Sequence, residues 1–301
     1  MWSVLITQKT IMSNILVTGC DGQLGLEIKE LSENYPNFQM VFSGTSKLDL
    51  TEHDAVMRYF NENDFDFVIN SAAYTNVDKA ESEPYKASEV NHLAVENLAK
   101  ICKDRNIGLI HISTDYVFDG SSDIPYTETE IPNPKTVYGK TKLEGEIALK
   151  AVNPKRSLII RTSWLYSKFG NNFVSSIISK AKENKQISVV NDQIGSPTSA
   201  FELAKVILDI IPKIDNKDVE VFHFSSFGEC SWFDFAKEIF RGSDLDVNLQ
   251  SISSADFSSL APRPAYSVLN CDKIKNRFGI SILDWKTSFK KVDFSSLAEE
   301  A

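Results

Sequence analysis

The chain has 301 residues, of which 42% are hydrophobic and 24% are charged, with a formal net charge of −9. This composition is typical of a globular protein with one large domain or two smaller ones. The acidic balance and the lack of a basic stripe argue against a nucleic-acid partner, and no apolar run is long enough to cross a bilayer.

Residues 1–11 contain one lysine and a short apolar run, which is a poor match to a signal peptide. We therefore expect the fold to begin near Met12 and the protein to be cytoplasmic. The four cysteines support this expectation, because they are far apart and form no Cys-x-x-Cys pair, as in proteins of a reducing compartment.

The first predicted strand, 14–18, enters a glycine-rich turn that opens a helix over 23–34. Glycines let the backbone approach a pyrophosphate, and free N–H groups at a helix start favour an anion. The alternative is an ordinary glycine turn between a strand and a helix. The glycines predicted to contact a dinucleotide are Gly19, Gly22 and Gly25.

A second strand is predicted over 38–43. The acid that normally binds a ribose 2′-hydroxyl after this strand is absent, and Ser46 and Lys47 could accept a 2′-phosphate instead. The sequence therefore favours NADPH, or the use of both NADPH and NADH. Asp49 and Leu50 would lie beside the adenine, although a surface turn is the alternative for Asp49.

A helix is predicted over 52–63, with Thr51 as its N-cap, followed by a strand over 65–70 and a long helix over 84–106. The strand ends in Ser-Ala-Ala-Tyr-Thr at 71–75. Small residues there, Ala72 among them, would let a cofactor lie against the backbone. A tight, well-packed turn is the alternative.

A fourth strand over 107–112 leads to Thr114, and a helix over 136–151 carries Tyr138 and Lys142. Side chains four residues apart share one helical face. The reference pKa of a tyrosine is about 10, and a neighbouring ammonium should lower it. Thr114 would hold a substrate oxygen together with Tyr138, unless its hydroxyl only satisfies local backbone groups. These features predict a nicotinamide-dependent oxidoreductase of the short-chain type.

A fifth strand is predicted over 157–161. Alternating strands and helices predict a doubly wound parallel sheet, with ligands at the carboxyl ends of its strands. We expect a Rossmann-like dinucleotide domain over 12–163 and mainly a smaller substrate-binding lobe over 164–301. A strand near 219–224 should return to the main sheet. The later helices are predicted over 172–183, 200–211, 231–240 and 271–278.

The four histidines have no metal-ligand spacing. His111 and His223 fall within strand-like runs, so the sequence predicts partly buried core histidines there and no metal site.

Several long sequence motifs resemble those of the extended short-chain dehydrogenase/reductase superfamily. They are far more specific than the glycine turn, and the resemblance runs from Asn14 to about Trp285. These motifs occupy residues 75–81, 113–120, 137–146, 161–164 and 191–193.

The resemblance implies reduction, by NAD(P)H, of the 4-keto group of dTDP-4-dehydro-6-deoxy-L-mannose to dTDP-L-rhamnose, a precursor of cell-surface polysaccharide. It implies that Tyr138 is the proton donor, that Lys142 holds the nicotinamide ribose and that Thr114 assists at the sugar oxygen. The residues that match cofactor contacts are Gly22, Gln23, Leu24, Asp49, Leu50, Ala73 and Tyr74. Those that match substrate contacts are Thr114, Asp115 and Trp164, and we expect Arg263 to pair with a phosphate.

Some relatives are dimers with magnesium held by glutamates at the interface. Glu27 and Glu202 are the candidates in this chain, but Lys286 stands where an acid is expected. The resemblance thus implies a homodimer and allows magnesium, but the lysine at this position argues against a bound metal.

Two alternatives stay open. Another nucleotide-sugar reductase or epimerase of the superfamily fits, because the base of the substrate cannot be read from these residues; a dehydratase does not, since Tyr116 rather than a glutamate follows Asp115. A non-catalytic regulatory subunit is the other alternative, because the beta subunit of methionine adenosyltransferase has a similar fold. The intact set of Thr114, Tyr138 and Lys142 favours an enzyme.

Overall fold

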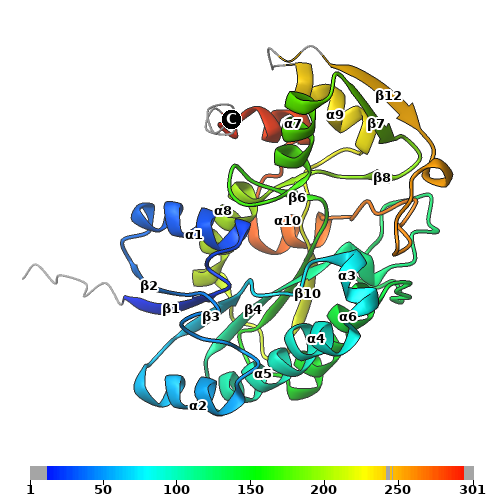
Figure 1. The fold of residues 1–301 in the computed structure, drawn as a ribbon. Coiled ribbons are helices and arrows are strands. Elements are labelled where there is room, and N and C mark those ends of the chain that lie inside the picture. The colour runs from blue at the N-terminus through cyan, green and yellow to red at the C-terminus, as the bar shows by residue number, and fades with distance from the viewer. Residues whose placement is uncertain (1–11, 242–244, 246, 295–301) are drawn as a thin grey trace, which may run out of the picture.

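The computed structural model describes residues 12–241, 245 and 247–294. Its centre is a six-stranded sheet in which all neighbours are parallel, in the order β10-β5-β4-β3-β1-β2 (Figure 1). The doubly wound parallel sheet is thus confirmed, and the predicted strand near 219–224 joins it at the edge beside β5. The strands are β1 (Ser13–Thr18), β2 (Phe38–Ser43), β3 (Phe67–Asn70), β4 (Gly108–Thr114), β5 (Leu158–Thr162) and β10 (Glu220–His223).

Both faces of the sheet are covered by helices, which lie above and below it in Figure 1. Ile15 and Val17 point to one layer and Leu16 to the other, and all three are fully buried. Burial on both faces explains why these strands read as continuous apolar runs. One layer contains α1 (Gln23–Leu31), α8 (Ala200–Ile210) and α10 (Asp272–Phe278), and the other α2 (His53–Glu62), α5 (Ala94–Asp104) and α6 (Val137–Val152).

Two predictions of local structure need correction. Thr51 is not an N-cap, because α2 begins at His53 and the Thr51 hydroxyl donates instead to the Asp49 carboxylate at 2.7 Å. The helix predicted over 84–106 is divided into α4 (Pro84–Ser88), a π-helical turn η2 (Glu89–Leu93) and α5. A π turn inserts one residue into the helical ladder and is often found at functional sites. A further helix, α3 (Val77–Ser82), precedes α4.

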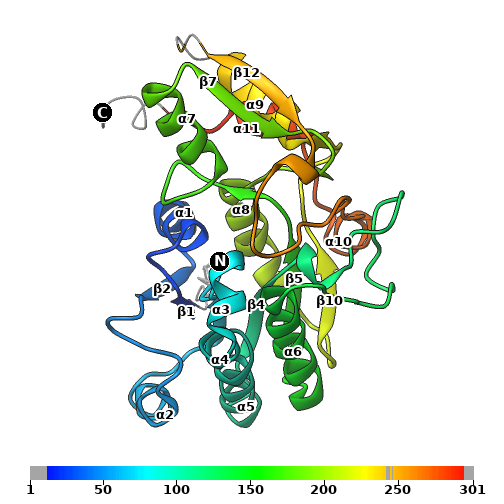
Figure 2. The same ribbon diagram turned by 45° about the vertical axis from the view of Figure 1, so that its right-hand side comes forward.

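A smaller lobe lies at the top of both views (Figures 1 and 2). It has a separate, aromatic-rich core that includes Tyr166, Phe235 and Trp285. Its parallel ribbon joins segments some sixty residues apart, and the sequence predicted neither strand. The lobe contains α7 (Phe173–Glu183), α9 (Trp232–Arg241), α11 (Trp285–Lys290), β7 (Gln186–Val190) and β12 (Asn248–Ile252). Two short strand pairs are β6 (Leu165–Tyr166) with β9 (Thr198–Ser199) and β8 (Ile194–Gly195) with β11 (Cys230–Ser231).

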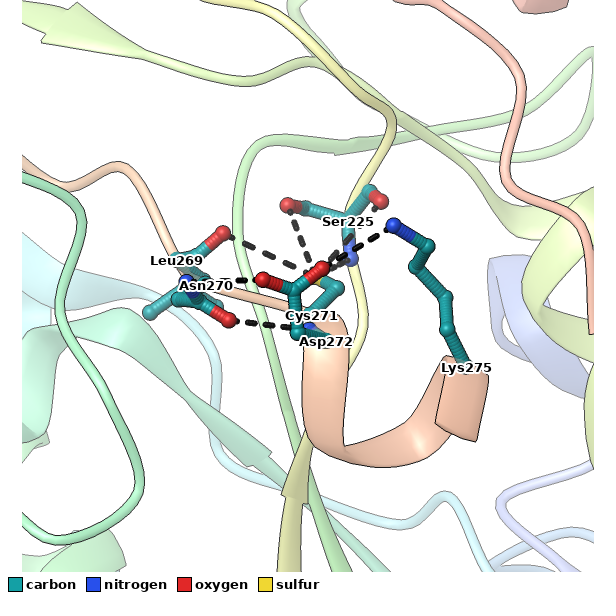
Figure 3. A network of polar contacts seen from close by, with 6 residues as sticks. All are labelled: Ser225, Leu269, Asn270, Cys271, Asp272 and Lys275. Atoms are coloured by element: carbon teal, nitrogen blue, oxygen red, sulfur yellow. Dashed lines mark hydrogen bonds and ion pairs between the residues drawn. The ribbon is translucent and has the colours of Figure 1, made fainter. Parts of the chain in front are cut away.

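The start of α10 is fixed to the segment after β10 by a compact set of polar contacts (Figure 3). The Ser225 N–H donates to the Cys271 sulfur at 3.2 Å, and the Asp272 N–H donates to the Asn270 side chain at 2.8 Å. Lys275 donates to Asp272 one turn later, at 2.9 Å. The Ser225–Cys271 contact joins the start of α10 to the edge of the sheet, so residues 164–294 contribute both to the lobe and to the sheet layers.

The remaining helical turns are short: η1 (Ser32–Asn34), η3 (Asp115–Val117), η4 (Ile211–Lys213) and η5 (Ser254–Asp256). The four cysteines are free thiols. Over the described residues, no helix combines the length and the hydropathy that a membrane span requires.

Candidate active site

The turn between β1 and α1 packs too tightly for any residue but glycine. Gly19 adopts φ +65°, and a Cβ there would lie 2.5 Å from the Ala72 nitrogen; a Cβ at Gly25 would overlap the Cys20 backbone. Gly22 caps α1 without a side-chain hydrogen bond, so the first N–H groups of the helix are free for an anion. The Gln23 Oε1 atom is buried with no partner. This cradle fits the pyrophosphate of a dinucleotide.

A surface pocket of about 310 Å³ lies beyond the end of β2. Ser46, Lys47 and Asp49 line it, as does Arg58, which the sequence reasoning missed. Arg58 comes from α2, and only the packing of that helix brings it to the end of β2. Leu50 is 7% exposed and belongs to the core beneath, so its side chain is not presented to a ligand.

The segment after β3 is held by Asn91, another residue that the sequence reasoning missed. The Tyr74 N–H donates to the Asn91 side chain at 2.9 Å, and the Asn91 amide donates to the Tyr74 carbonyl and to the Thr141 hydroxyl, both at 3.1 Å. Asn91 lies in the π-helical turn and is fully buried. The irregular turn thus ties the loop carrying Ala72 and Ala73 to α6.

Helix α6 carries Tyr138 and Lys142 on the face that packs against β4. Thr136 caps the helix through the Gly139 N–H at 3.0 Å, which places Tyr138 in the first turn and Lys142 in the second. The Lys142 ammonium donates to the Ile112 carbonyl of β4 at 2.6 Å. Thr114 is the last residue of that strand rather than the residue beyond it.

The pKa of Tyr138 differs from the sequence-based expectation. Burial raises the pKa of Tyr138 to about 12, the Asp115 carboxylate adds to this rise, and the Thr114 hydroxyl opposes it. Burial lowers the pKa of Lys142 to about 8, against the opposing effect of Glu146. The expected lowering of the Tyr138 pKa by Lys142 is therefore wrong: burial dominates, and Lys142 is not among the causes of the shift. Tyr138 is a protonated phenol at neutral pH, which is the form that an acid needs.

Two buried polar atoms at the site have no partner. The Thr114 hydroxyl donates to Asp115 Oδ1 at 2.9 Å, but Asp115 Oδ2 is unbonded, and burial raises the pKa of this carboxyl to about 6. Arg263 Nη2 donates to Asp78 at 2.6 Å, while Nη1 is buried and unbonded. The sequence predicted Asp115 and Arg263 as ligand-binding residues, and both have hydrogen-bonding capacity that a polar ligand could use.

Trp164 lies two residues beyond the strand position that pairs with Thr114. Its φ of +47° is rare for a bulky residue, and its ring stacks on Trp232 with centroids 3.5 Å apart and planes 5° apart. A Cβ at Gly195 would overlap the Trp164 indole. Trp232 and Gly195 thus restrict the position of the Trp164 ring, and the sequence reasoning identified neither residue.

A buried ion pair between Glu146 and Arg161 lies one turn beyond Lys142 on α6. Glu146 follows Lys142 by one turn and accepts hydrogen bonds from Arg161 Nε at 2.9 Å and Nη2 at 2.6 Å, and from the Ser113 hydroxyl at 2.5 Å. The Glu146 and Arg161 side chains are only 1% and 2% exposed. The pair links α6 to β4 and β5, close to the catalytic candidates.

The candidate magnesium ligands have other partners. Glu27 accepts a hydrogen bond from the Ser167 hydroxyl at 2.5 Å, and burial raises its pKa. Glu202 pairs with Lys291 at 3.6 Å, and Lys286 lies over the Trp285 ring. Across residues 12–241, 245 and 247–294, no three His, Cys, Asp or Glu side chains form a group that could hold a metal ion.

Residues 12–294 match the family model described as the RmlD substrate binding domain. The chain is 38% identical over 293 residues to the dTDP-4-dehydrorhamnose reductase of Sinorhizobium fredii, covering 95% of this chain and 98% of that protein. It is 37% identical over 289 residues to the enzyme of the same name from Escherichia coli, covering 93% and 96%.

Two solved structures are also similar to this chain. The dTDP-4-dehydrorhamnose reductase of Clostridium acetobutylicum has a TM-score of 0.88 and 41% identity, covering 95% of this chain and 99% of that one. The enzyme of Bacillus anthracis, solved in complex with NADP, has a TM-score of 0.88 and 35% identity, covering 93% and 98%.

Proposed function

This chain belongs to the RmlD substrate binding domain family, and from that membership we infer that it reduces the 4-keto group of dTDP-4-dehydro-6-deoxy-L-mannose to dTDP-L-rhamnose with NADPH or NADH. The observation that carries the chemistry is the phenol of Tyr138, which burial keeps protonated beside Thr114. The nicotinamide cofactor, held by the glycine turn and Lys142, would supply the hydride for the sugar C4 carbon.

We propose that Tyr138 gives its proton to the sugar oxygen as negative charge develops there. The Thr114 hydroxyl, at the end of β4, would donate a second hydrogen bond to the same oxygen. Lys142 would hold the nicotinamide ribose and resupply the proton to Tyr138. A lysine with a pKa of about 8 can do so, because it is charged at neutral pH but releases its proton readily.

We propose that the glycine turn and the loop after β3 hold the dinucleotide. The cofactor-binding residues would be Gly19, Gly22, Gln23, Leu24, Gly25, Asp49, Leu50, Ala72, Ala73, Tyr74, Tyr138 and Lys142. The free N–H groups of α1 and the unpartnered Gln23 Oε1 support this assignment. Leu50 would contribute through its backbone, because its side chain is buried in the core.

We expect Arg58→Ala to weaken the binding of NADPH by about tenfold, because it removes a cation from the pocket that would hold the 2′-phosphate. Binding of NADH, which lacks that phosphate, should change less than twofold. Fluorescence titration with each cofactor measures both values. An equal loss of affinity for both cofactors would place Arg58 outside the phosphate subsite.

For the substrate, we propose contacts from Thr114, Asp115, Trp164 and Arg263. The unbonded Arg263 Nη1 would donate to a diphosphate oxygen, and the Trp164 ring, held by Trp232, would pack against the sugar or base. Residues 12–163, together with β10, would then serve mainly the dinucleotide, and the lobe within 164–301 the nucleotide sugar.

The charge of Lys142 predicts the pH dependence of the reaction. The pKa of this buried ammonium is lowered to about 8, so it is charged below that pH and neutral above it. We expect kcat/KM for NADPH to fall about tenfold for each pH unit above about pH 8. The exposed Lys140→Met should leave this profile unchanged, whereas a flat profile in the wild-type enzyme would exclude the proposed role of Lys142.

The function is tested by the loss of reduced-nicotinamide absorbance with dTDP-linked and GDP-linked 4-keto-6-deoxy sugars, each with NADPH and NADH. We expect turnover with the dTDP sugar. No oxidation with any pair would favour a regulatory subunit, and a preference for the GDP sugar would indicate another reductase of the superfamily. We also propose a cytoplasmic homodimer, as the resemblance implies; light scattering on the purified protein tests the dimer.

A further inference from the structure

A row of buried polar side chains crosses the sheet and ends at Lys142. Thr18 of β1, Asn70 of β3 and His111 of β4 are paired in register on neighbouring strands. The Thr18 hydroxyl bonds to Asn70 Oδ1 at 2.8 Å, Asn70 Nδ2 lies 3.1 Å from His111 Nδ1, and His111 Nε2 lies 3.4 Å from Lys142 Nζ. Each of the four residues is at most 1% exposed. The predicted burial of His111 is confirmed, but this histidine belongs to a polar network.

The backbone fixes the direction of these hydrogen bonds. The Ala72 N–H donates to Asn70 Oδ1 at 3.2 Å, so this atom is the amide oxygen and the Asn70 NH₂ group faces His111. His111 Nδ1 must therefore accept. Burial and the neighbouring Lys142 lower the pKa of His111 well below its usual value, so the imidazole is neutral and has one N–H. That proton lies on Nε2 and points at Lys142.

An N–H group that faces an ammonium brings two donors together. The same N–H makes a hydrogen bond when the lysine is an uncharged amine, because the amine nitrogen has a free lone pair. The Ile112 carbonyl, 2.6 Å from Nζ, accepts a hydrogen bond from either form of Lys142. The hydrogen-bonding groups around Nζ therefore favour the amine form of Lys142.

We propose that His111 is a positioning residue that donates its Nε2–H to the amine of Lys142 and so keeps this lysine able to release its proton near neutral pH. The inference rests on the proposed roles of Tyr138 and Lys142. After Tyr138 gives its proton to the sugar oxygen, the Lys142 ammonium gives one to the phenolate and becomes an amine. His111 stabilises that amine until it regains a proton from water.

Other charged groups near Lys142 do not replace this interaction. On α6, Tyr138 lies one turn before Lys142, and Glu146, which favours the ammonium, lies one turn after it. Glu146 is bound to Arg161 of β5. On the helices packed against α6, Glu81 accepts from the Val137 N–H, and Lys86, His92 and Lys100 pair with Glu83, Glu144 and Glu96. Asp115 of η3 accepts from the Thr114 hydroxyl, and Glu89 of η2 is exposed.

The tautomer can be observed without activity or cofactor. Long-range proton–nitrogen NMR of protein labelled with nitrogen-15 histidine reports which ring nitrogen carries the proton. The chain has only four histidines, and the signal lost in His111→Gln identifies this one. We expect the Nε2–H form between pH 7 and the unfolding limit. An Nδ1–H form or a charged ring would overturn the proposal.

The effect on Lys142 is seen in the basic limb of the pH profile of kcat/KM for NADPH. We expect His111→Leu to move this limb upward by about 0.5–1 pH unit, since one hydrogen bond to the amine is lost. His111→Gln keeps an amide N–H and should move the limb less. This conservative variant also serves if the leucine variant does not fold. His223→Leu is the matched control: His223 is equally buried in β10 but contacts Arg161 instead, so the limb should stay.

The failures of the two proposals can be told apart. If the limb does not move in either His111 variant while Tyr138→Phe is inactive, the role of His111 is wrong and the proposed function stands. If Tyr138→Phe stays active, the proposed function itself is wrong. A downward shift of the limb in His111→Leu would show that this residue stabilises the ammonium instead, and would also overturn the inference.

Discussion

Replacing Tyr138 by phenylalanine should lower kcat by about 10²–10⁴-fold, the usual contribution of a positioned general acid. The phenol is the acid that burial keeps protonated at neutral pH, with a pKa of about 12, and the substitution removes only its hydroxyl. The ring still packs edge-to-face on Tyr116, 5.5 Å away, so the start of α6 should not move. Stopped-flow or steady-state measurement of NADPH oxidation gives the rate.

The same variant should bind NADPH within about twofold of the wild-type affinity, since Lys142 and the glycine turn are intact. Tyr85→Phe is a matched control, because Tyr85 is 86% exposed on α4 and its change should leave kcat unaffected. Near wild-type turnover of Tyr138→Phe would exclude this residue as the proton donor. A loss of NADPH binding would show that the effect is not confined to proton transfer.

Replacing Arg161 by leucine should lower the free energy of unfolding by about 3–5 kcal/mol, because it leaves the Glu146 carboxylate buried without its cation. In this variant the Ser113 hydroxyl still donates to Glu146, but the two hydrogen bonds from Arg161 Nε and Nη2 are lost. Urea denaturation followed by circular dichroism measures the loss. Activity should fall as well, because Glu146 fixes α6 one turn beyond Lys142.

A second substitution separates the lost pairing from the lost packing. Arg161→Leu combined with Glu146→Leu removes both charges, and a buried pair replaced by apolar residues is often neutral in stability. We therefore expect the double variant to be more stable than Arg161→Leu alone. Lys205→Ala is the exposed control: its pair with Asp209 lies on the surface of α8, and its loss should cost about 0–1 kcal/mol. Equal losses in the single and double variants would contradict the unpaired-charge explanation.

Much of the sheet was predictable because its strands are buried on both faces. Such strands are short apolar runs bounded by glycines and polar residues, and the predicted span 157–161 differs by one residue from β5, which is buried along its whole length. The helix predicted over 84–106 shows the limit of such patterns. Its apolar spacing continues through the π-helical turn, where Asn91 makes hydrogen bonds to Tyr74 and Thr141, residues outside the helix.

The strands β7 and β12 were missed for a different reason. They are half exposed and pair only with each other, across the segment that contains α8, β10 and α9. β12 has little apolar content, whereas Ile187 and Val189 of β7 alternate with polar residues, a strand-like pattern that the sequence reasoning overlooked. Strand propensity depends on the partner that packs against each residue, and that partner is not visible in the sequence.

The glycine turn, the strand that leads to Thr114 and the Tyr138–Lys142 pair were readable from the chain alone, because each depends on residues that are close together in the sequence. The protonation states of these groups depend instead on how distant parts of the chain pack around them. The contacts at these groups, Asp115 beside Tyr138 and His111 beside Lys142, join different strands and helices. Burial, which dominates the pKa of Tyr138 and of Lys142, is likewise a property of the packed molecule.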